Sequence, residues 1–307
     1  MSLVPTPHRW LRLDKIKEDS FRGECDAPGP KSRAFGGQVL AQALRAAYAT
    51  VPTGYYVNSL HCYFIRGGME KEPIIYEVKR IRNGRNFCIR TVEAIQLGSI
   101  IHSSEFSFQK EEGVSTFVVS PPFPQVPRPE SLQPYAISRD QYLASGRDPK
   151  LVRPIDIARV APRCEIRPVN PETFVQGSKD PGVMTQYIWF TYLDKVEASE
   201  PELAHTTLAY MSDLTLVTTG LLPYTQGVKF KLSTSLDHSI WFHQFRFDAN
   251  EWLLYETEVV GHSANRSLVN GRIWSRNGQL LCSTSQEVLV YPDSAANADN
   301  TTEQAKL

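Results

Sequence analysis

The pattern of apolar and polar positions in the first half of the chain predicts one helix followed by four strands. Across residues 38–49, apolar side chains recur every three or four positions in a segment rich in Ala, Leu, Gln and Arg, which is the spacing of an amphipathic helix. The segments that follow carry β-branched and aromatic residues and are separated by turns that contain Gly or Asn. The predicted strands cover residues 57–66, 73–82, 87–96 and 100–109.

The second half of the chain repeats this order. Residues 201–220 have the composition of a helix, which we expect to end at Gly220. Gly98 aligns with Gly278 at an offset of 180 residues, and His61 aligns with His238 at an offset of 177. This near-constant offset indicates an internal duplication in pattern, though not in residue identity. The predicted strands of the second copy cover residues 235–247, 251–260, 266–275 and 280–290.

A connector from about residue 111 to residue 167 separates the two copies. Its segment SPPFPQVPRP, residues 120–129, cannot form the interior of a sheet and should lie extended across the surface. A helix followed by an antiparallel sheet, twice, predicts an α+β protein in which each sheet wraps around its helix and the two sheets pair edge to edge. We expect an N-terminal domain at 1–120, the proline-rich connector at 121–165, a C-terminal domain at 166–292 and a flexible tail at 293–307.

Composition and charge exclude several classes of function. Lys plus Arg and Asp plus Glu each number 33, so the net charge is zero, whereas a nucleic-acid-binding protein is normally basic. The chain has no apolar run near 18 residues, which predicts no membrane span, and its first residues lack the apolar core of a secretion signal. The five cysteines have irregular spacing and the seven histidines form no metal-binding motif, so we expect neither a disulfide framework nor a metal site.

The C-terminal residues suggest where in the cell the protein is located. The segment after Tyr291 is polar and almost without apolar residues, and it ends in Ala305, Lys306 and Leu307. This tripeptide is similar to the Ser-Lys-Leu signal that the peroxisomal import receptor reads, with Ala in place of Ser. We therefore predict the import receptor as a partner and the peroxisome as the location.

Five motifs together resemble one enzyme family. In chain order they are RAFGGQVLAQALRAA, SLHCYFIRGG, RNGRNF, DHSIWFH and STSQE, and the similarity extends from about residue 11 to residue 291. They resemble the acyl-CoA thioesterase II family, whose members contain two fused hotdog domains. The resemblance implies that the chain hydrolyses fatty acyl-CoA thioesters to free acid and CoA without a metal or redox cofactor, and that it forms a homo-oligomer.

The resemblance also implies three catalytic residues. They are Asp213 in YMSDLTL, Ser235 in STSLDHS and Gln286 in STSQE, and all three retain the residue type that the family uses. Departures from the family pattern occur elsewhere, at Asn58, Asn83, Asn86 and the segment 66–69, RGGM.

These three residues also make chemical sense without the resemblance. Asp213 stands among apolar residues on the second predicted helix, where a buried carboxylate is costly unless it is hydrogen-bonded. Burial would raise its pKa towards the range of a general base, although an exposed or anchoring position remains open. Ser235 and Gln286 are polar residues in strands, where a solvent-facing position is the ordinary expectation. Together, the three side chains can hold and activate one water molecule.

The start of the first helix raises a separate question. Gly36 and Gly37 stand where the first turn begins, so its free N–H groups have no capping side chain. Either the glycines form a tight turn, or a ligand must approach the backbone there. If a ligand binds, the N–H groups near Gly36, Gly37 and Gln38 can stabilise the negative charge that develops on a thioester oxygen. His61 is either a structural sheet histidine or a contributor to this substrate site.

Other arrangements of residues favour rival functions less strongly. Asp237, His238 and Ser239 are neighbours in a strand, and alternate side chains point to opposite faces, so they cannot form a catalytic triad. An enoyl-CoA hydratase of similar fold would pair a helical His with an acid, and His205 lies eight residues from Asp213. A non-catalytic acyl-CoA-binding protein is the third alternative, but it would gain nothing from a buried carboxylate. A basic hairpin at residues 79–90 is either solvated or a contact for CoA phosphates.

Overall fold

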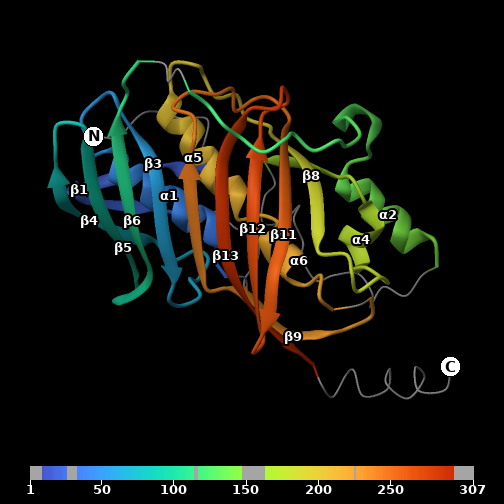
Figure 1. Ribbon diagram of the computed structural model, residues 1–307. Helices are drawn as coiled ribbons and strands as arrows, with labels where there is room; N and C mark the ends of the chain where they lie inside the picture. Colours follow the sequence, from blue (N-terminus) through green and yellow to red (C-terminus); the bar gives the residue numbers. More distant parts are fainter. Residues whose placement is uncertain (1–8, 26–32, 114–116, 147–162, 225, 294–307) are drawn as a thin grey trace.

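The protein is built around one long antiparallel sheet. The computed structural model describes residues 9–25, 33–113, 117–146, 163–224 and 226–293. Within these residues the sheet has 13 strands in the order β1-β2-β4-β5-β6-β3-β10-β13-β12-β11-β8-β7, and β9 pairs with β13 (Figure 1). The N-terminal strands are β1 (Leu13–Lys17), β2 (Ser20–Gly23), β3 (Tyr55–Phe64), β4 (Ile74–Asn83), β5 (Phe87–Gln96) and β6 (Ser99–Lys110). The C-terminal strands are β7 (Cys164–Pro168), β8 (Thr185–Tyr192), β9 (Phe230–Ser235), β10 (Asp237–Phe242), β11 (Leu253–Ser263), β12 (Arg266–Trp274) and β13 (Leu280–Pro292).

Two strands join the halves of this sheet. β3 of the first half pairs with β10 of the second, so that Cys62 lies opposite His238. On either side of this central pair the strand order is similar, with β6, β5 and β4 on one side and β13, β12 and β11 on the other. The edge-to-edge pairing expected from the sequence is therefore present. The aligned turn glycines, Gly98 and Gly278, both have positive φ, at 73° and 84°.

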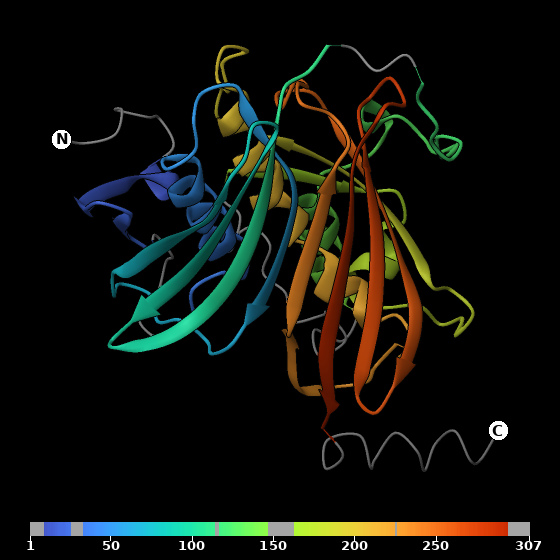
Figure 2. The ribbon, with the colours of Figure 1, turned by 60° about the vertical axis from the view of Figure 1, so that its left-hand side comes forward.

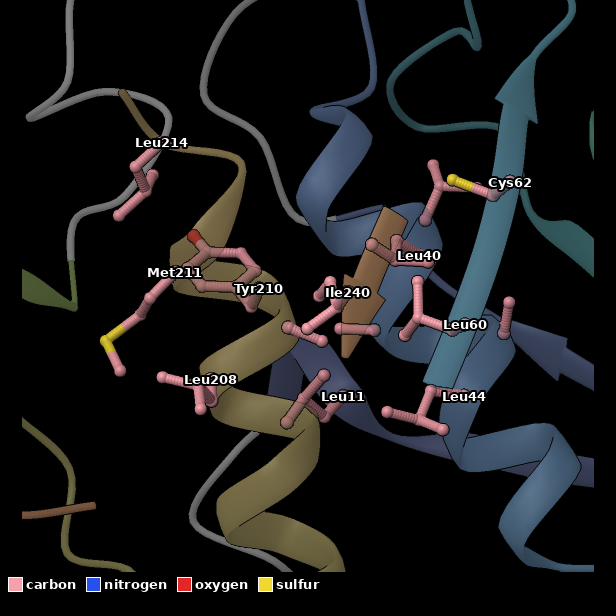
Figure 3. Close-up of a cluster of buried hydrophobic side chains, with 14 of the residues drawn as sticks. Leu11, Leu40, Leu44, Leu60, Cys62, Leu208, Tyr210, Met211, Leu214 and Ile240 are labelled. Atoms are coloured by element: carbon pink, nitrogen blue, oxygen red, sulfur yellow. The ribbon is translucent and has the colours of Figure 1, made fainter. Parts of the chain in front are cut away.

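The helices cover one face of the sheet (Figures 1 and 2). The central pair is α1 (Gly36–Tyr48) and α5 (Pro201–Ser212), which pack against each other. In Figure 3, Leu40 and Leu44 of α1 lie beside Leu60 of β3, with Leu208 of α5 across from them. Burying each such leucine stabilises the fold by about 1.5–3 kcal/mol. The other helical segments are η1 (Arg9–Leu11), η2 (Pro129–Ser131), α2 (Tyr135–Ala144), α4 (Pro171–Gln176) and α6 (Leu216–Gly220).

The predicted helix at 201–220 is wrong in one important respect. It is two helices, α5 and α6, with a break at residues 213–215. The Ser212 Oγ donates a hydrogen bond to the Ala209 carbonyl at 2.8 Å and so satisfies a backbone group at the helix end. Asp213 follows as the C-cap residue. The break places a carboxylate at a helix terminus rather than along a helix face.

Two further features of the sheet differ from the prediction. The strand expected at 235–247 is shorter and covers only Asp237–Phe242, as β10, and Ser235 instead ends β9, which was not predicted. β1, β2, β7 and β8 were not predicted, and they extend the sheet at its two ends. Residues 117–128 contain no helix or strand and are largely exposed, as expected of the proline-rich segment. That segment is anchored where Trp189 Nε1 donates to the Pro127 carbonyl at 2.9 Å. The bounds of the four predicted segments, 1–120, 121–165, 166–292 and 293–307, stay a prediction.

No helix in the described ranges has the length and apolar composition needed to cross a membrane. All five cysteines are free thiols.

Candidate active site

Asp213 lies where α5 ends, in a tightly supported position. The residue is 6% exposed. Tyr255 Oη, from β11, donates a hydrogen bond to the Ser212 carbonyl at 2.9 Å. His238 Nε2, from β10, lies 2.9 Å from Ser212 Oγ. Because side chains of both strands contact Ser212, the residue before Asp213, the position of the carboxylate relative to the sheet is defined.

Burial changes the acid–base behaviour of this carboxylate. It raises the pKa of Asp213 from 3.8 to about 7. Hydrogen bonding from the Gly37 backbone N–H and from the Gln286 and Ser235 side chains favours the charged form and offsets part of this rise. Asp213 Oδ1 is buried and has no hydrogen-bond partner among the described residues. A carboxylate with a near-neutral pKa can take a proton from a bound water molecule.

Ser235 and Gln286 lie beside Asp213 although all three are far apart in the chain. Ser235 is the last residue of β9 and pairs with Val288 of β13. Because Gln286 lies two residues before Val288, its side chain is on the same face of β13 and next to Ser235. Gln286 is fully buried, and its Nε2 donates to Ser235 Oγ at 2.7 Å. The structure therefore brings the three predicted polar residues together around one point.

The first turn of α1 faces Asp213 from the other half of the molecule. Its N-cap residue, Phe35, makes no side-chain hydrogen bond to the helix. A Cβ added to Gly36 would lie 2.8 Å from Asp213 Oδ2, and one added to Gly37 would lie 2.6 Å from the Tyr210 carbonyl oxygen. Neither glycine has a positive φ, so close approach rather than backbone conformation requires them. The positive end of the helix dipole, with uncapped N–H groups, is thus directed at this site.

Two residues that were predicted to bind substrate do not face this site. The Gln38 backbone N–H, which was predicted to be available to a ligand, donates to the Phe35 carbonyl at 3.1 Å, and the buried side-chain amide donates to the carbonyls of Trp10 and Glu24, both at 3.1 Å. Its role is to connect α1 to the N-terminal segment. His61 is exposed on the outer face of the sheet, because alternate residues of β3 point in opposite directions, and its Nδ1 lies 3.0 Å from Ser239 Oγ. Neither the Gln38 N–H nor the His61 side chain is therefore placed to bind substrate in this site, contrary to the prediction.

A cavity of about 540 Å³ opens beside Asp213 and is lined by both halves of the molecule. This volume is in the range of small-molecule sites. Arg33 and Arg66 line it, are exposed, and form no ion pair with another described residue. Neither arginine was predicted to bind substrate, although each stands shortly before a Gly-Gly pair, in RAFGG and in RGG. The cavity is also lined by His102, which was not predicted either.

The basic hairpin is a weaker candidate for phosphate contact than these two arginines. Lys79 Nζ lies 3.3 Å from a Glu93 carboxylate oxygen, and Arg80 forms a two-point ion pair with Asp19 at 2.8 Å. Arg90 is fully buried and bonded to backbone and side-chain oxygens of its surroundings. The charges of this hairpin are largely engaged within the protein.

The rival constellations are not assembled. His238 points inward to Ser212, whereas Ser239 points outward to His61, so no Asp-His-Ser triad forms. His205 is buried with its Nδ1 3.1 Å from Tyr48 Oη, and burial lowers its pKa to about 4, so it does not pair with Asp213 as a hydratase would require. In the described part of the chain, no cluster of His, Cys, Asp or Glu is placed to hold a metal ion.

Comparison with known proteins identifies the family of this chain. The family model described as acyl-CoA thioesterase matches residues 164–289, and the model described as acyl-CoA thioesterase N-terminal domain matches residues 26–109. Mouse acyl-coenzyme A thioesterase 8 is 37% identical over 286 residues, which cover 91% of this chain and 87% of the relative. The chain belongs to the acyl-CoA thioesterase family. It is thus a thioester hydrolase that acts on acyl-CoA.

Two further relatives extend the comparison. The yeast peroxisomal acyl-coenzyme A thioester hydrolase 1 is 27% identical, with 85% of this chain and 86% of the relative covered. The crystal structure of an acyl-CoA thioesterase II from Mycobacterium marinum superposes with a TM-score of 0.72 at 30% identity, covering 93% of this chain and 98% of that one. The α+β double-hotdog fold expected from the sequence is confirmed.

Proposed function

We propose that the chain hydrolyses fatty acyl-CoA by attack of a water molecule that Asp213 activates. The observation that carries this proposal is the buried Asp213 carboxylate, with its pKa raised to about 7 by burial and with Ser235 and Gln286 beside it. A water molecule held by the Asp213 carboxylate gives up a proton to it as the water oxygen attacks the thioester carbonyl carbon. The Ser235 hydroxyl and the Gln286 amide orient the water at attack distance.

The start of α1 completes the reaction centre in this proposal. As the carbonyl carbon becomes tetrahedral, its oxygen gains negative charge that the Gly36 N–H and the helix dipole stabilise. The C–S bond then breaks, and the CoA thiolate takes the proton from Asp213. The products are a free acid and CoA, and the carboxylate is ready for another turnover. No cofactor takes part in these steps.

Arg33 and Arg66 are proposed to receive the phosphates of CoA. Both line the mouth of the cavity, and guanidinium groups bind phosphate oxygens through paired, charge-assisted hydrogen bonds. The Arg33 side chain packs on the backbone of Gly67, since a Cβ at that glycine would lie 2.8 Å from Arg33 Cδ. The acyl chain would then extend inward from the thioester.

Location and assembly are further proposals. The Ala305-Lys306-Leu307 sequence, which lies outside the described residues, supports import into peroxisomes through the import receptor, and one yeast relative is named as peroxisomal. Fusing the last residues of the chain to a fluorescent protein, with and without this tripeptide, tests the address. A homo-oligomer is proposed from the family resemblance, and light scattering of the purified protein tests it.

The hydrolytic proposal is tested by release of CoA from palmitoyl-CoA, followed with a thiol reagent. Wild-type protein should release CoA, and Asp213→Asn should reduce the rate by about a thousandfold or more while the far-UV spectrum is unchanged. Asp237→Asn is the matched control. Asp237 is an acid in the neighbouring strand whose Oδ1 accepts from the Glu287 N–H, so it should retain nearly full activity. Equal rates in Asp213→Asn and wild type would contradict the proposal.

A further inference from the structure

Exposed apolar side chains surround the end of the molecule where the cavity opens. Ile65 lines the cavity, and Met69, on the same loop after β3, is 54% exposed. Met69 N–H donates to Gln96 Oε1 at 2.7 Å, so this loop lies against the residue that precedes Leu97. Leu97, in the turn between β5 and β6, is 70% exposed. The first half of the molecule thus places three exposed apolar side chains at one end of its sheet.

The second half of the molecule adds two more at the same end. Leu232 of β9 pairs with Tyr291 of β13, and both side chains are exposed. Leu232 directly precedes residues 233–236, which line the cavity. The end of β3, the β5–β6 turn and β9 lie at the same end of the sheet in Figures 1 and 2. We name these five residues the apolar rim: Ile65, Met69, Leu97, Leu232 and Tyr291.

One residue of the apolar rim has an unfavourable backbone conformation. Leu97 has a φ of 49°, in the left-handed region that residues with a large side chain rarely adopt. Gly or Asn would fit this turn without strain. A leucine here is favourable neither for the turn nor for contact with water, and such strain is typical of functional positions. Contact of its side chain with an external apolar partner accounts for a leucine at this place.

The charges beside the apolar rim indicate the kind of partner. Four cationic side chains of the segments around the opening are exposed and form no ion pair with another described residue: Arg33, Arg66, Lys71 and Lys231. The acidic side chains of the same segments are half-buried, namely Glu70, Glu72 and Glu287, and Glu287 is paired with Arg266 at 2.7 Å. This end of the molecule is therefore cationic, although the net charge of the chain is zero. Exposed apolar side chains among unpaired cations match an anionic bilayer, which offers an acyl interior beneath charged headgroups.

We propose that the apolar rim, with Lys71 and Lys231, docks the protein on an anionic phospholipid membrane so that the cavity faces the bilayer. A long-chain acyl-CoA partitions into such a membrane, with its acyl chain among the lipids and its charged CoA in water. A docked protein takes up this chain without exposing it to water. This delivery of substrate rests on the proposed function, whereas docking itself does not depend on hydrolysis.

Sedimentation with vesicles in the absence of substrate tests the docking. Wild type should bind vesicles of phosphatidylcholine and phosphatidylserine at least about tenfold more tightly than vesicles of phosphatidylcholine alone, and added salt should weaken this binding. The double variant Leu97→Asn/Met69→Gln removes two apolar side chains, and Lys71→Gln/Lys231→Gln removes two charges. Each should weaken binding by about tenfold or more. Asn suits the backbone at position 97, so an unchanged Tm should show that the first variant is folded.

The matched control lies in the β4–β5 hairpin at the opposite end of the sheet. Arg82 and Arg85 are exposed and unpaired among the described residues, and Ile81 is also exposed. Ile81→Gln and Arg82→Gln/Arg85→Gln should bind vesicles as wild type does. Equal binding of wild type to both kinds of vesicle, or wild-type binding by the rim variants, would overturn the proposal. If wild type binds no vesicles and light scattering shows that the rim variants change its oligomeric state, a second copy covers the rim and the proposal is also overturned.

A kinetic measurement separates this proposal from the hydrolytic one. Palmitoyl-CoA carried in the anionic vesicles is compared with hexanoyl-CoA, which stays in solution. In Leu97→Asn/Met69→Gln, the rate for vesicle-borne palmitoyl-CoA should fall by about tenfold or more, and kcat/KM for hexanoyl-CoA should change by less than about twofold. If wild type hydrolyses neither thioester, the proposed function fails while vesicle binding still decides the docking. Equal rates of wild type and this variant on vesicle-borne palmitoyl-CoA would refute delivery of substrate from the membrane.

Discussion

Keeping Asp213 buried should cost the protein stability in a way that depends on pH. The pKa of Asp213 is about 7 in the folded protein and 3.8 for the unperturbed side chain. Below pH 3.8 the group is protonated in both folded and unfolded chains and opposes folding least. As the pH rises towards 7, the unfolded chain releases its proton and the folded chain retains it. The stability contributed by the group is therefore lost over this interval.

The size of the effect follows from the shift. Each unit of pKa difference corresponds to about 1.4 kcal/mol, so the full loss is about 4 kcal/mol above pH 7. Between pH 5.5 and pH 8 the contribution of Asp213 should lower the free energy of unfolding by about 2 kcal/mol. Since the residue is 6% exposed, solvent screening reduces this figure little. Asp213→Asn removes the titrating group and should remove this pH dependence.

Urea unfolding at several pH values measures the effect. From pH 5.5 to pH 8, the free energy of unfolding of wild type should fall by about 2 kcal/mol more than that of Asp213→Asn. Asp140→Asn, which changes an exposed carboxylate on α2, should follow wild type. The amide side chain introduced at position 213 can change the absolute stability of the variant, but an amide does not titrate. The comparison therefore uses the change in the free energy of unfolding with pH. Parallel curves for wild type and Asp213→Asn would refute the claim that burial raises the pKa of Asp213.

Three substitutions test other parts of the site. Gln286→Ala should lower kcat by about tenfold or more in the palmitoyl-CoA assay, because a group that orients the water is lost, and unchanged turnover would remove Gln286 from the site. Gly37→Ala places a methyl group 2.6 Å from the Tyr210 carbonyl oxygen. It should therefore lower the free energy of unfolding, measured with urea, by about 1–3 kcal/mol. If the variant is as stable as wild type, α1 can move away from α5. Arg66→Ala should raise KM by about threefold to tenfold with little change in kcat, and less so at high salt, whereas an unchanged KM would place the CoA phosphates elsewhere.

The longer strands in the two halves of the sheet were well predicted because each strand carries its own local pattern. Residues 87–96 were predicted and observed as β5, and the turn glycines 98 and 278 occupy equivalent positions. The pairing of the two sheets followed from the need to cover open edges. The short strands β1, β2, β7 and β8 were missed, because segments of four to eight residues carry too few positions to show a period.

The site was predicted in its residue types more than in its geometry. The resemblance and the unusual position of a carboxylate among apolar residues both pointed to Asp213, but the break between α5 and α6, which places Asp213 at a helix end, was not predicted. The Gln38 N–H was predicted to be free for a ligand, but it donates to the Phe35 carbonyl three residues earlier, in the first turn of α1. His61 was assigned two possible roles without knowing which face of the sheet it would occupy, and His102 was not considered. Composition does not reveal that face; strand register does.

The central claim is that the ionised form of Asp213 drives hydrolysis, and the pH dependence of kcat/KM for palmitoyl-CoA tests it most directly. Because burial raises the pKa of Asp213 to about 7, kcat/KM of wild type should increase about tenfold per pH unit below this value and level off above it. In Ser235→Ala the inflection should move to higher pH, since one hydrogen bond that favours the ionised form is lost. A wild-type profile that is flat from pH 5 to pH 9, or one that persists unchanged in Asp213→Asn, would contradict the account.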